Sequence, residues 1–545
     1  MLDKRDMSKP TPTKGRIEIY DTTLRDGAQG EGVAFTQVDK IRITQHLDAL
    51  GVDFVEGGYP LSNPKDAAFF TDSTKLNLKH ARVCAFGMTR RRGTATADDE
   101  GMRALVESGA PVITIVGKTW DLQVTDVLRV EPGENLNMIR QSLLHCRSGG
   151  AAVFYDAEHF FDGFQDNREY ALQTLAAALE GGAERLILCD TNGGSLPTWV
   201  GQVVDDVKQH LGTDVPLGIH AHDDIGLSVA VSLAAVEHGC THVQGTINGI
   251  GERCGNVDLT TVVANLKLKM GYDCLRGDSL AKLTETSRFV YERANMNAPS
   301  HQPFVGTAAF AHKGGMHVHA VRRAARSYEH VEPKTVGNTR RFLVSELSGV
   351  SNIAEVLGDK FDFAADRDVQ RRLLQRVQEL ENQGYQFEAA TASFELLLHE
   401  LVDKRPTHWR LDHYRCVILK TGDEGSVTEA IVKLSVGDTF EHNVADGDGP
   451  VNALDGALRK CLVRHYPQID DVHLRDFRVR VVNPTAESAA KVRVNADFVV
   501  QGGEDGGESD YFATIGVNEN IVDASWQALT DAFMYHLMKL GVVAK

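Results

Sequence analysis

Short runs of hydrophobic residues recur between residue 16 and about residue 250, and a stretch long enough for a helix separates each run from the next. This alternation predicts repeated βα units. Eight runs occur, as a (β/α)8 barrel requires. A doubly wound open sheet stays possible, because a hydrophobic period does not show whether a sheet closes. The runs are residues 17–20, 54–55, 82–86, 112–116, 152–155, 186–189, 217–219 and 241–244.

Nearly every run ends in polar or glycine-rich residues, whereas the turn that precedes it is plain. In a (β/α)8 barrel the functional groups lie at the C-terminal ends of the strands. We therefore expect the site in the segments that follow the runs, which are residues 21–27, 56–60, 87–90, 117–119, 156–159, 190–193, 220–224 and 245–249.

The pattern changes downstream of the eight runs. Residues from about 355 to 405 are rich in Leu, Glu, Gln and Arg at helical spacing, and strand-like patterns begin at about residue 412. Two similar segments, 446–458 and 516–529, align with Ala457 on Ala528, and each joins strands to an amphipathic helix, which indicates an internal duplication. We predict an α/β chain with a disordered lead (1–15), a TIM-barrel domain (16–280), helical subdomains and a connector (281–410), and a C-terminal α+β regulatory domain (411–545).

Composition narrows the function classes. The chain has 545 residues, of which 42% are hydrophobic and 24% charged, as in ordinary globular proteins. A net charge of -17 argues against nucleic-acid binding, and no window of about 18 apolar residues could cross a membrane. The eight cysteines are scattered without a C-x-x-C pair, which favours reduced thiols and a cytoplasmic location.

A candidate metal site lies at the ends of two of the predicted strands. His220 and His222 project to one side of a strand because residues i and i+2 share a face, so both imidazoles can reach one ion. Asp26, after the first strand, would add a carboxylate, and the open positions that remain suit a chelating 2-oxo acid. Arg25 could stabilise the alkoxide formed when the ketone is attacked. The alternative for Arg25 is a structural ion pair with a barrel carboxylate.

Three segments together resemble a known family: residues 21–27 (DTTLRDG), 220–222 (HAH) and 248–256 (NGIGERCGN). They are similar to the DRE-TIM metallolyases, in the branch of the 2-isopropylmalate, homocitrate and citramalate synthases. The resemblance implies acetyl-CoA as co-substrate and a divalent metal ion, Mn2+, Mg2+ or Zn2+. It implies that Asp26, His220, His222 and Asn256 surround the metal, that Arg25 and Thr191 contact the oxo acid, and that Glu158 lies beside the reacting carbons.

The glycine-rich segment 248–256 admits two interpretations. Glycines let the backbone approach a ligand closely, and the resemblance implies that Gly249 and Gly251 contact acyl-CoA. The alternative is a tight turn that closes the barrel.

Condensation also needs a base for the acetyl methyl group. Residues 310–320 are dense in His and Gly beyond the barrel, which is typical of a functional loop. The resemblance implies that His317, supplied by the partner subunit, assists enolisation with Tyr328 nearby. Glu158 is the competing base, and the sequence does not choose between them.

The nature of the oxo acid rests on three further segments, residues 56–66, 328–333 and 344–349, which resemble the citramalate branch. This implies condensation of acetyl-CoA with pyruvate to (R)-citramalate in isoleucine biosynthesis. The alternatives are a 2-isopropylmalate synthase acting on 2-oxoisovalerate, and a metal-dependent lyase or aldolase on the same barrel. The duplicated C-terminal unit resembles the regulatory domain of these synthases, which implies a homodimer with isoleucine as feedback inhibitor; a purely structural dimerisation role is the alternative.

Overall fold

The computed structural model describes residues 14–277, 279–342, 367–387, 390–402, 405–420, 422, 425–482, 490–500 and 510–545. The chain divides into two compact units. The first is Met1–Phe310 with Glu329–Arg340, and the second is Ala311–Tyr328 with Arg341–Lys545. Most of the predicted lead (1–15) and all of segment 344–349 lie outside the described residues.

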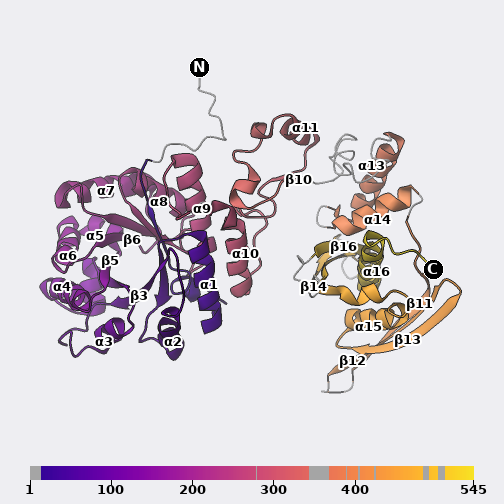
Figure 1. Ribbon diagram of the computed structural model, residues 1–545, viewed down its shortest axis with the longest axis horizontal. Helices are drawn as coiled ribbons and strands as arrows, with labels where there is room; N and C mark the ends of the chain where they lie inside the picture. Colours follow the sequence, from indigo (N-terminus) through magenta and orange to yellow (C-terminus); the bar gives the residue numbers. More distant parts are fainter. Residues whose placement is uncertain are drawn as a thin grey trace. The chain divides into compact units, whose positions relative to one another are not determined.

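The first unit is built on eight parallel strands that close into a barrel in the order β1 to β8, and helices surround them (Figure 1). Closure is visible at β1, which pairs with β2 on one side and with β8 on the other. The predicted (β/α)8 barrel is therefore confirmed, and the doubly wound sheet is excluded. The strands are β1 (Glu18–Asp21), β2 (Phe54–Gly58), β3 (Arg82–Met88), β4 (Val112–Lys118), β5 (Ala152–Glu158), β6 (Arg185–Asp190), β7 (Leu217–Ala221) and β8 (His242–Gly245).

Local signals mark the ends of the barrel helices. The first helix, α1, begins after Thr36, whose hydroxyl accepts from the backbone N–H of Asp39 in a capping box. It ends at Gly51, which takes the left-handed conformation (φ 89°) that glycine adopts most readily. The helices are α1 (Gln37–Leu50), α2 (Pro64–Ser73), α3 (Glu100–Glu107), α4 (Pro132–Ser148), α5 (Phe160–Asp166), α6 (Arg168–Glu180), α7 (Pro197–Leu211), α8 (Ser228–Glu237), α9 (Leu259–Asn265) and α10 (Leu283–Arg293).

Side chains fill the inside of the barrel. Tyr20, Phe54 and Phe154 are buried in one cluster, with the rings of Phe54 and Phe154 5.2 Å apart between centroids. Residues that alternate with them along the strands, such as Ile19 and Val55, belong to a second core shared with the helices. Because the interior is packed, open space is left at the ends of the strands.

The second unit contains helices and two small antiparallel sheets. Its two-residue strands β9 (Ala311–His312) and β10 (Arg341–Phe342) pair in parallel. Across the described residues of the whole chain, no helix is long and apolar enough to cross a membrane. The remaining elements are α11 (Gly315–Arg323), α13 (Arg367–Asn382), α14 (Thr391–Leu401), β11 (Arg410–Lys420), β12 (Ser426–Val436), β13 (Thr439–Gly447), α15 (Pro450–Leu462), β14 (Val472–Val481), β15 (Val492–Val500), β16 (Asp510–Asn518) and α16 (Ile521–Lys539).

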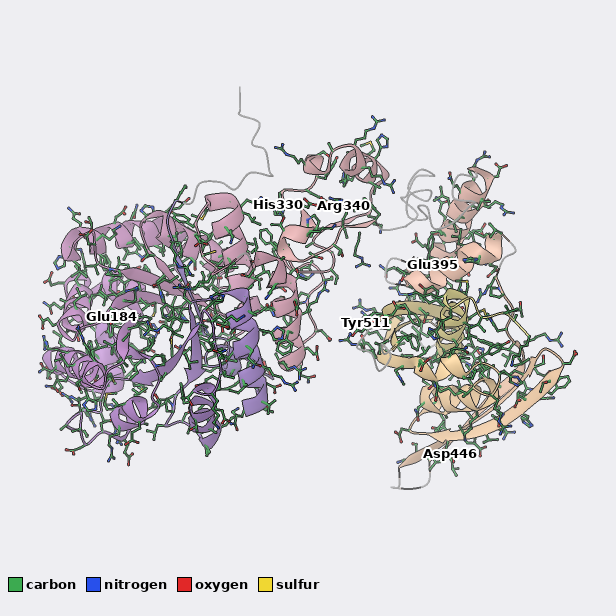
Figure 2. All side chains as sticks on the ribbon, viewed as in Figure 1. Glu184, His330, Arg340, Glu395, Asp446 and Tyr511 are labelled. Atoms are coloured by element: carbon green, nitrogen blue, oxygen red, sulfur yellow. The ribbon has the colours of Figure 1, made fainter. Side chains whose placement is uncertain are left out.

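The predicted duplication is present in the C-terminal part. Strands β11, β12 and β13 form one sheet followed by α15, and β14, β15 and β16 form a second sheet followed by α16. The first strand pair of each sheet has a register shift near its start, after Leu411 and after Leu474. Figure 2 labels one residue of each sheet, Asp446 on β13 and Tyr511 on β16. The apolar faces of both helices share one core, which includes Leu458 and Phe533.

Candidate active site

A pocket of about 290 Å³ opens at the C-terminal ends of the barrel strands. The residues that line it come from the polar strand ends: Arg25 and Asp26 follow β1, Glu158 ends β5, Thr191 follows β6 and His222 follows β7. The location agrees with the face on which a (β/α)8 barrel carries its chemistry.

Asp26, His220 and His222 form a cluster in this pocket. One ligand atom of each lies within 4.8 Å of the corresponding atoms of the other two, close enough to share one metal ion. All three residues are buried. The structure therefore brings together the three residues in which the sequence suggested metal ligands.

Asn256 joins this cluster through its amide. Its Nδ2 donates to Asp26 Oδ1 at 3.2 Å and to the Ile250 carbonyl at 3.3 Å. Two buried acceptor-capable atoms of these residues, Asn256 Oδ1 and His222 Nδ1, have no hydrogen-bond partner among the described residues. Buried polar atoms are rarely left unpaired without a functional reason. Two imidazoles, one carboxylate and an unpaired amide oxygen form a donor set that fits a divalent cation.

The protonation of Asp26 and His222 also suits a cation. Burial opposes the charge of His220, but its hydrogen bond with Asp26 raises its pKa, so a bound cation would take the place of the proton between His220 and Asp26. Burial disfavours the charge of Asp26, but the Arg25 guanidinium and the hydrogen bond with His220 outweigh it, so the pKa of Asp26 lies well below its ordinary value. Burial and the neighbouring charge of His220 lower the pKa of His222 to about 4. At neutral pH the carboxylate is therefore ionised and the His222 imidazole is neutral, as metal ligation requires.

Arg25 is held from two sides. Its Nη1 lies 3.1 Å from Asp26 Oδ2, its Nε donates to Glu56, and its guanidinium carbon lies 3.8 Å from the centre of the Phe86 ring. Glu56 is fully buried and accepts a 2.6 Å hydrogen bond from the Tyr20 hydroxyl. Arg25 therefore fits both of its predicted roles: it forms an ion pair with a barrel carboxylate, and it lines the pocket, where it could contact a substrate.

Glu158 forms an ion pair with Lys118, and both side chains line the pocket. The pair follows from strand register, since Lys118 lies opposite Glu158 where β4 pairs with β5. Thr191 also lines the pocket, and its hydroxyl accepts from the backbone N–H of His159 at 2.8 Å. Glu56 and Lys118 have no role in the sequence-based predictions, although both lie among the polar residues at the strand ends, and that signal could have identified them.

The glycine-rich loop supports Asn256 directly. Gly249 has φ 69°, and a Cβ atom on Gly251 would lie only 2.3 Å from Asn256 Nδ2. The loop residues that line the pocket are Glu252 and Arg253. Arg253 donates to Asp224 and to the Thr191 carbonyl, and so ties the loop to the ends of β6 and β7. The contact of Gly249 and Gly251 with acyl-CoA stays a prediction.

His317 and Tyr328 contact each other in the second unit. The His317 ring, on α11, stacks on the Tyr328 ring with centroids 4.2 Å apart and planes at 30°. Every residue that lines the described pocket belongs to the first unit. The structure thus pairs these two predicted residues with each other, and their role in catalysis stays a prediction.

Known proteins resemble the chain along almost its whole length. It is 46% identical to the (R)-citramalate synthase of Aquifex aeolicus over 96% of this chain and 98% of that protein. The identity to the (R)-citramalate synthase of Geobacter sulfurreducens is also 46%, with the same coverage of both chains. The chain belongs to the (R)-citramalate synthase family. A probable 2-isopropylmalate synthase of Methanopyrus kandleri is less similar, at 30% identity over 94% of this chain and 97% of that protein.

Three family models match consecutive parts of this member of the (R)-citramalate synthase family. The HMGL-like model matches residues 16–290, which include the barrel. The homocitrate synthase post-HMGL domain-like model matches residues 304–385, and the LeuA allosteric (dimerisation) domain matches residues 388–537. The family resemblance inferred from the three motifs is confirmed.

Proposed function

We propose that the chain condenses acetyl-CoA with pyruvate and water to give (R)-citramalate and free CoA. The observation that carries the proposal is the cluster of Asp26, His220 and His222 beside Arg25, in a chain that is 46% identical to (R)-citramalate synthases. The new carbon–carbon bond joins the acetyl methyl carbon to the ketone carbon of pyruvate. Water then cleaves the thioester and releases the thiol.

Asp26, His220 and His222 would hold a divalent cation, with Asn256 as a nearby fourth group. Mn2+, Mg2+ and Zn2+ are the candidates, because the donor set combines imidazole nitrogens with carboxylate and amide oxygens. When bound, the cation supplies a Lewis acid for a 2-oxo acid. The burial of the three residues and the unpaired Asn256 Oδ1 support this assignment.

Arg25 is proposed to stabilise the alkoxide oxygen that develops on pyruvate. Its guanidinium keeps its positive charge in the buried site because Glu56 and Asp26 lie next to it, and they hold its pKa above the ordinary value although burial opposes the charge. Glu56 also restricts the orientation of the guanidinium, so that little reorganisation is needed as the charge develops. Thr191 is proposed as a further contact for the oxo acid.

Glu158 is proposed to lie beside the reacting carbons and to move a proton there. It lines the pocket, and Lys118 fixes the position of its carboxylate through their ion pair. We propose His317 of the partner subunit as the second proton-transfer group, assisted by Tyr328. The stacking of the two rings supports a joint role, because it limits the freedom of the imidazole.

Pyruvate is favoured over 2-oxoisovalerate by the similarity of the whole chain. The identity is 46% to two (R)-citramalate synthases, against 30% to the probable 2-isopropylmalate synthase. A synthase is favoured over a lyase or aldolase because the duplicated C-terminal sheets match an allosteric domain. A lyase would not need that domain.

We further propose a cytosolic homodimer that is inhibited by isoleucine, with acyl-CoA contacts at Gly249 and Gly251. The match of residues 388–537 to an allosteric dimerisation domain supports the dimer and the regulation. The eight cysteines are all free thiols, in keeping with a reducing compartment.

The test is the release of free CoA thiol from acetyl-CoA by the purified chain with Mn2+ or Mg2+. We expect release with pyruvate and much less with 2-oxoisovalerate or 2-oxoglutarate. No release with any of the three acids would refute the synthase, and a preference for 2-oxoisovalerate would reassign the substrate. Isoleucine should inhibit the reaction, and insensitivity to isoleucine, leucine and valine would refute feedback control.

The matched variant for the metal site is His222→Ala. It removes one of the three clustered ligands and should abolish thiol release, because the two remaining ligands bind a cation weakly. Near-normal turnover by His222→Ala would contradict the assignment of the site.

A further inference from the structure

The side-chain amide of Gln244 lies between His220 and Asp156. Gln244 Oε1 is 2.9 Å from His220 Nδ1, and Gln244 Nε2 donates to Asp156 Oδ1 at 3.0 Å. All three residues are buried, Gln244 completely. The parallel register of β7 and β8 places His220 opposite Gln244, so the contact is part of the barrel itself.

The chemistry of the Gln244 amide decides which atom donates the hydrogen in each of these two contacts. Oε1 has lone pairs and no hydrogen, so the hydrogen of the contact must be on His220 Nδ1. If the amide were turned over, Oε1 would face Asp156 Oδ1, and two acceptors would meet in a buried place whenever the Asp156 carboxyl is ionised. The ionised Asp156 carboxylate therefore selects the orientation of the amide, and the amide selects the tautomer of the imidazole.

The other nitrogen of His220 faces the ligand cluster. His220 Nε2 lies 3.5 Å from Asp26 Oδ2, on the side of the ring opposite the Gln244 contact. An imidazole that carries its hydrogen on Nδ1 has a lone pair on Nε2, which is the form that binds a metal. His222 offers a contrast, because its buried Nδ1 has no hydrogen-bond partner among the described residues.

We propose that Gln244 and Asp156 are positioning residues that hold His220 as its Nδ1–H tautomer and so prepare Nε2 to bind a divalent cation. The inference rests on one part of the proposed function, the metal-binding role of Asp26, His220 and His222. The two histidines then differ: the barrel fixes the orientation of His220, whereas the metal ion that His222 binds would fix the orientation of His222.

The test measures Mn2+ binding to the full chain without substrates, with the signal of free Mn2+ followed by electron paramagnetic resonance. Gln244→Met keeps the length of the side chain but removes the acceptor for His220. Loss of such a partner weakens metal affinity by about 10–100-fold, and this is the expected rise in Kd. Gln141→Met is the control, because it removes an equivalent acceptor, 2.9 Å from Arg90 Nε, from a residue that does not line the pocket. It should leave Mn2+ affinity unchanged.

A charge transposition separates positioning from packing. In the double variant Asp156→Asn with Gln244→Glu, the carboxylate at position 244 accepts from His220 Nδ1–H and from the amide at position 156. The double variant keeps the hydrogen-bond pattern but carries the negative charge at position 244 instead of position 156. The double variant should therefore bind Mn2+ more tightly than Gln244→Glu alone, in which two carboxyl groups face each other.

Each outcome has a separate meaning. Wild-type affinity in folded Gln244→Met, or a double variant no better than Gln244→Glu, would overturn the proposal. If Gln244→Met does not fold, the comparison of the two glutamate variants decides alone. A wild-type chain that binds no Mn2+, or His222→Ala that binds it normally, would instead remove the metal site and with it the proposed function.

Discussion

Gly251 has a structural reason to be glycine that can be tested with a single methyl group. In Gly251→Ala the new Cβ atom would lie 2.3 Å from Asn256 Nδ2, whereas non-bonded heavy atoms prefer about 3.5 Å. The Asn256 amide must therefore move by about 1 Å, and functional groups tolerate only about 0.5 Å. The backbone of Gly251 has an ordinary φ, so the steric contact is the main effect of the substitution.

The magnitude follows from the hydrogen bonds that Asn256 would lose. Its Nδ2 donates to Asp26 and to the Ile250 carbonyl, and each bond contributes about 1 kcal/mol. A displacement that breaks both costs about 2 kcal/mol, equivalent to roughly 30-fold in Mn2+ affinity if the loss falls on the metal-bound state. We therefore expect the Kd for Mn2+ to rise by about 10–30-fold in Gly251→Ala.

The assay is Mn2+ titration of the folded variant, together with the KM for acetyl-CoA. Gly194→Ala is the matched control, because Gly194 also lies on a loop after a barrel strand and a Cβ there would meet nothing within 4 Å. It should bind Mn2+ like the wild type. Unchanged Mn2+ affinity in Gly251→Ala would refute the reasoning, and a raised KM for acetyl-CoA alone would show that Gly251 serves the acyl-CoA instead.

Three further predictions concern stability. Burial raises the pKa of Asp21 to about 7, so the folded chain holds a proton that the unfolded chain releases near pH 4. The stability that this group contributes is lost as the pH rises through 7, by about 1.3 kcal/mol between pH 6 and pH 8. Asp21→Asn should lack this loss in metal-free denaturant titrations. An equal change of unfolding free energy with pH in both proteins would contradict the prediction. Lys40→Met should destabilise the barrel by about 3–5 kcal/mol, because the buried carboxylate of Asp66, 2.6 Å from Lys40 Nζ, would lose its counter-ion. Urea titration checks this, and a loss under 1 kcal/mol would refute it. Phe533→Ala should cost about 3–5 kcal/mol by leaving a cavity in the C-terminal core, and scanning calorimetry should show the loss in the transition of that unit; an unchanged melting temperature would contradict it.

The sequence by itself determined the eight strands, the face of the barrel that carries the chemistry, and the C-terminal duplication. These features depend on local patterns: short apolar runs, polar residues at their ends, and similar segments that recur. The candidate metal ligands His220 and His222 were also visible, because two residues at i and i+2 share a side of any strand. Asp26 was named from its place after the first strand, and closure of the barrel brings it to them.

Only the tertiary structure decided which side chains hold these groups in place. Glu56 supports Arg25, Lys118 pairs with Glu158, and Gln244 contacts the ring of His220, and each of these contacts joins residues from different βα units of the barrel. Strand register sets two of the pairs directly, and register depends on how the whole barrel closes. A hydrophobic period says where a strand is but not which residue lies opposite, so these contacts could not be predicted from the sequence.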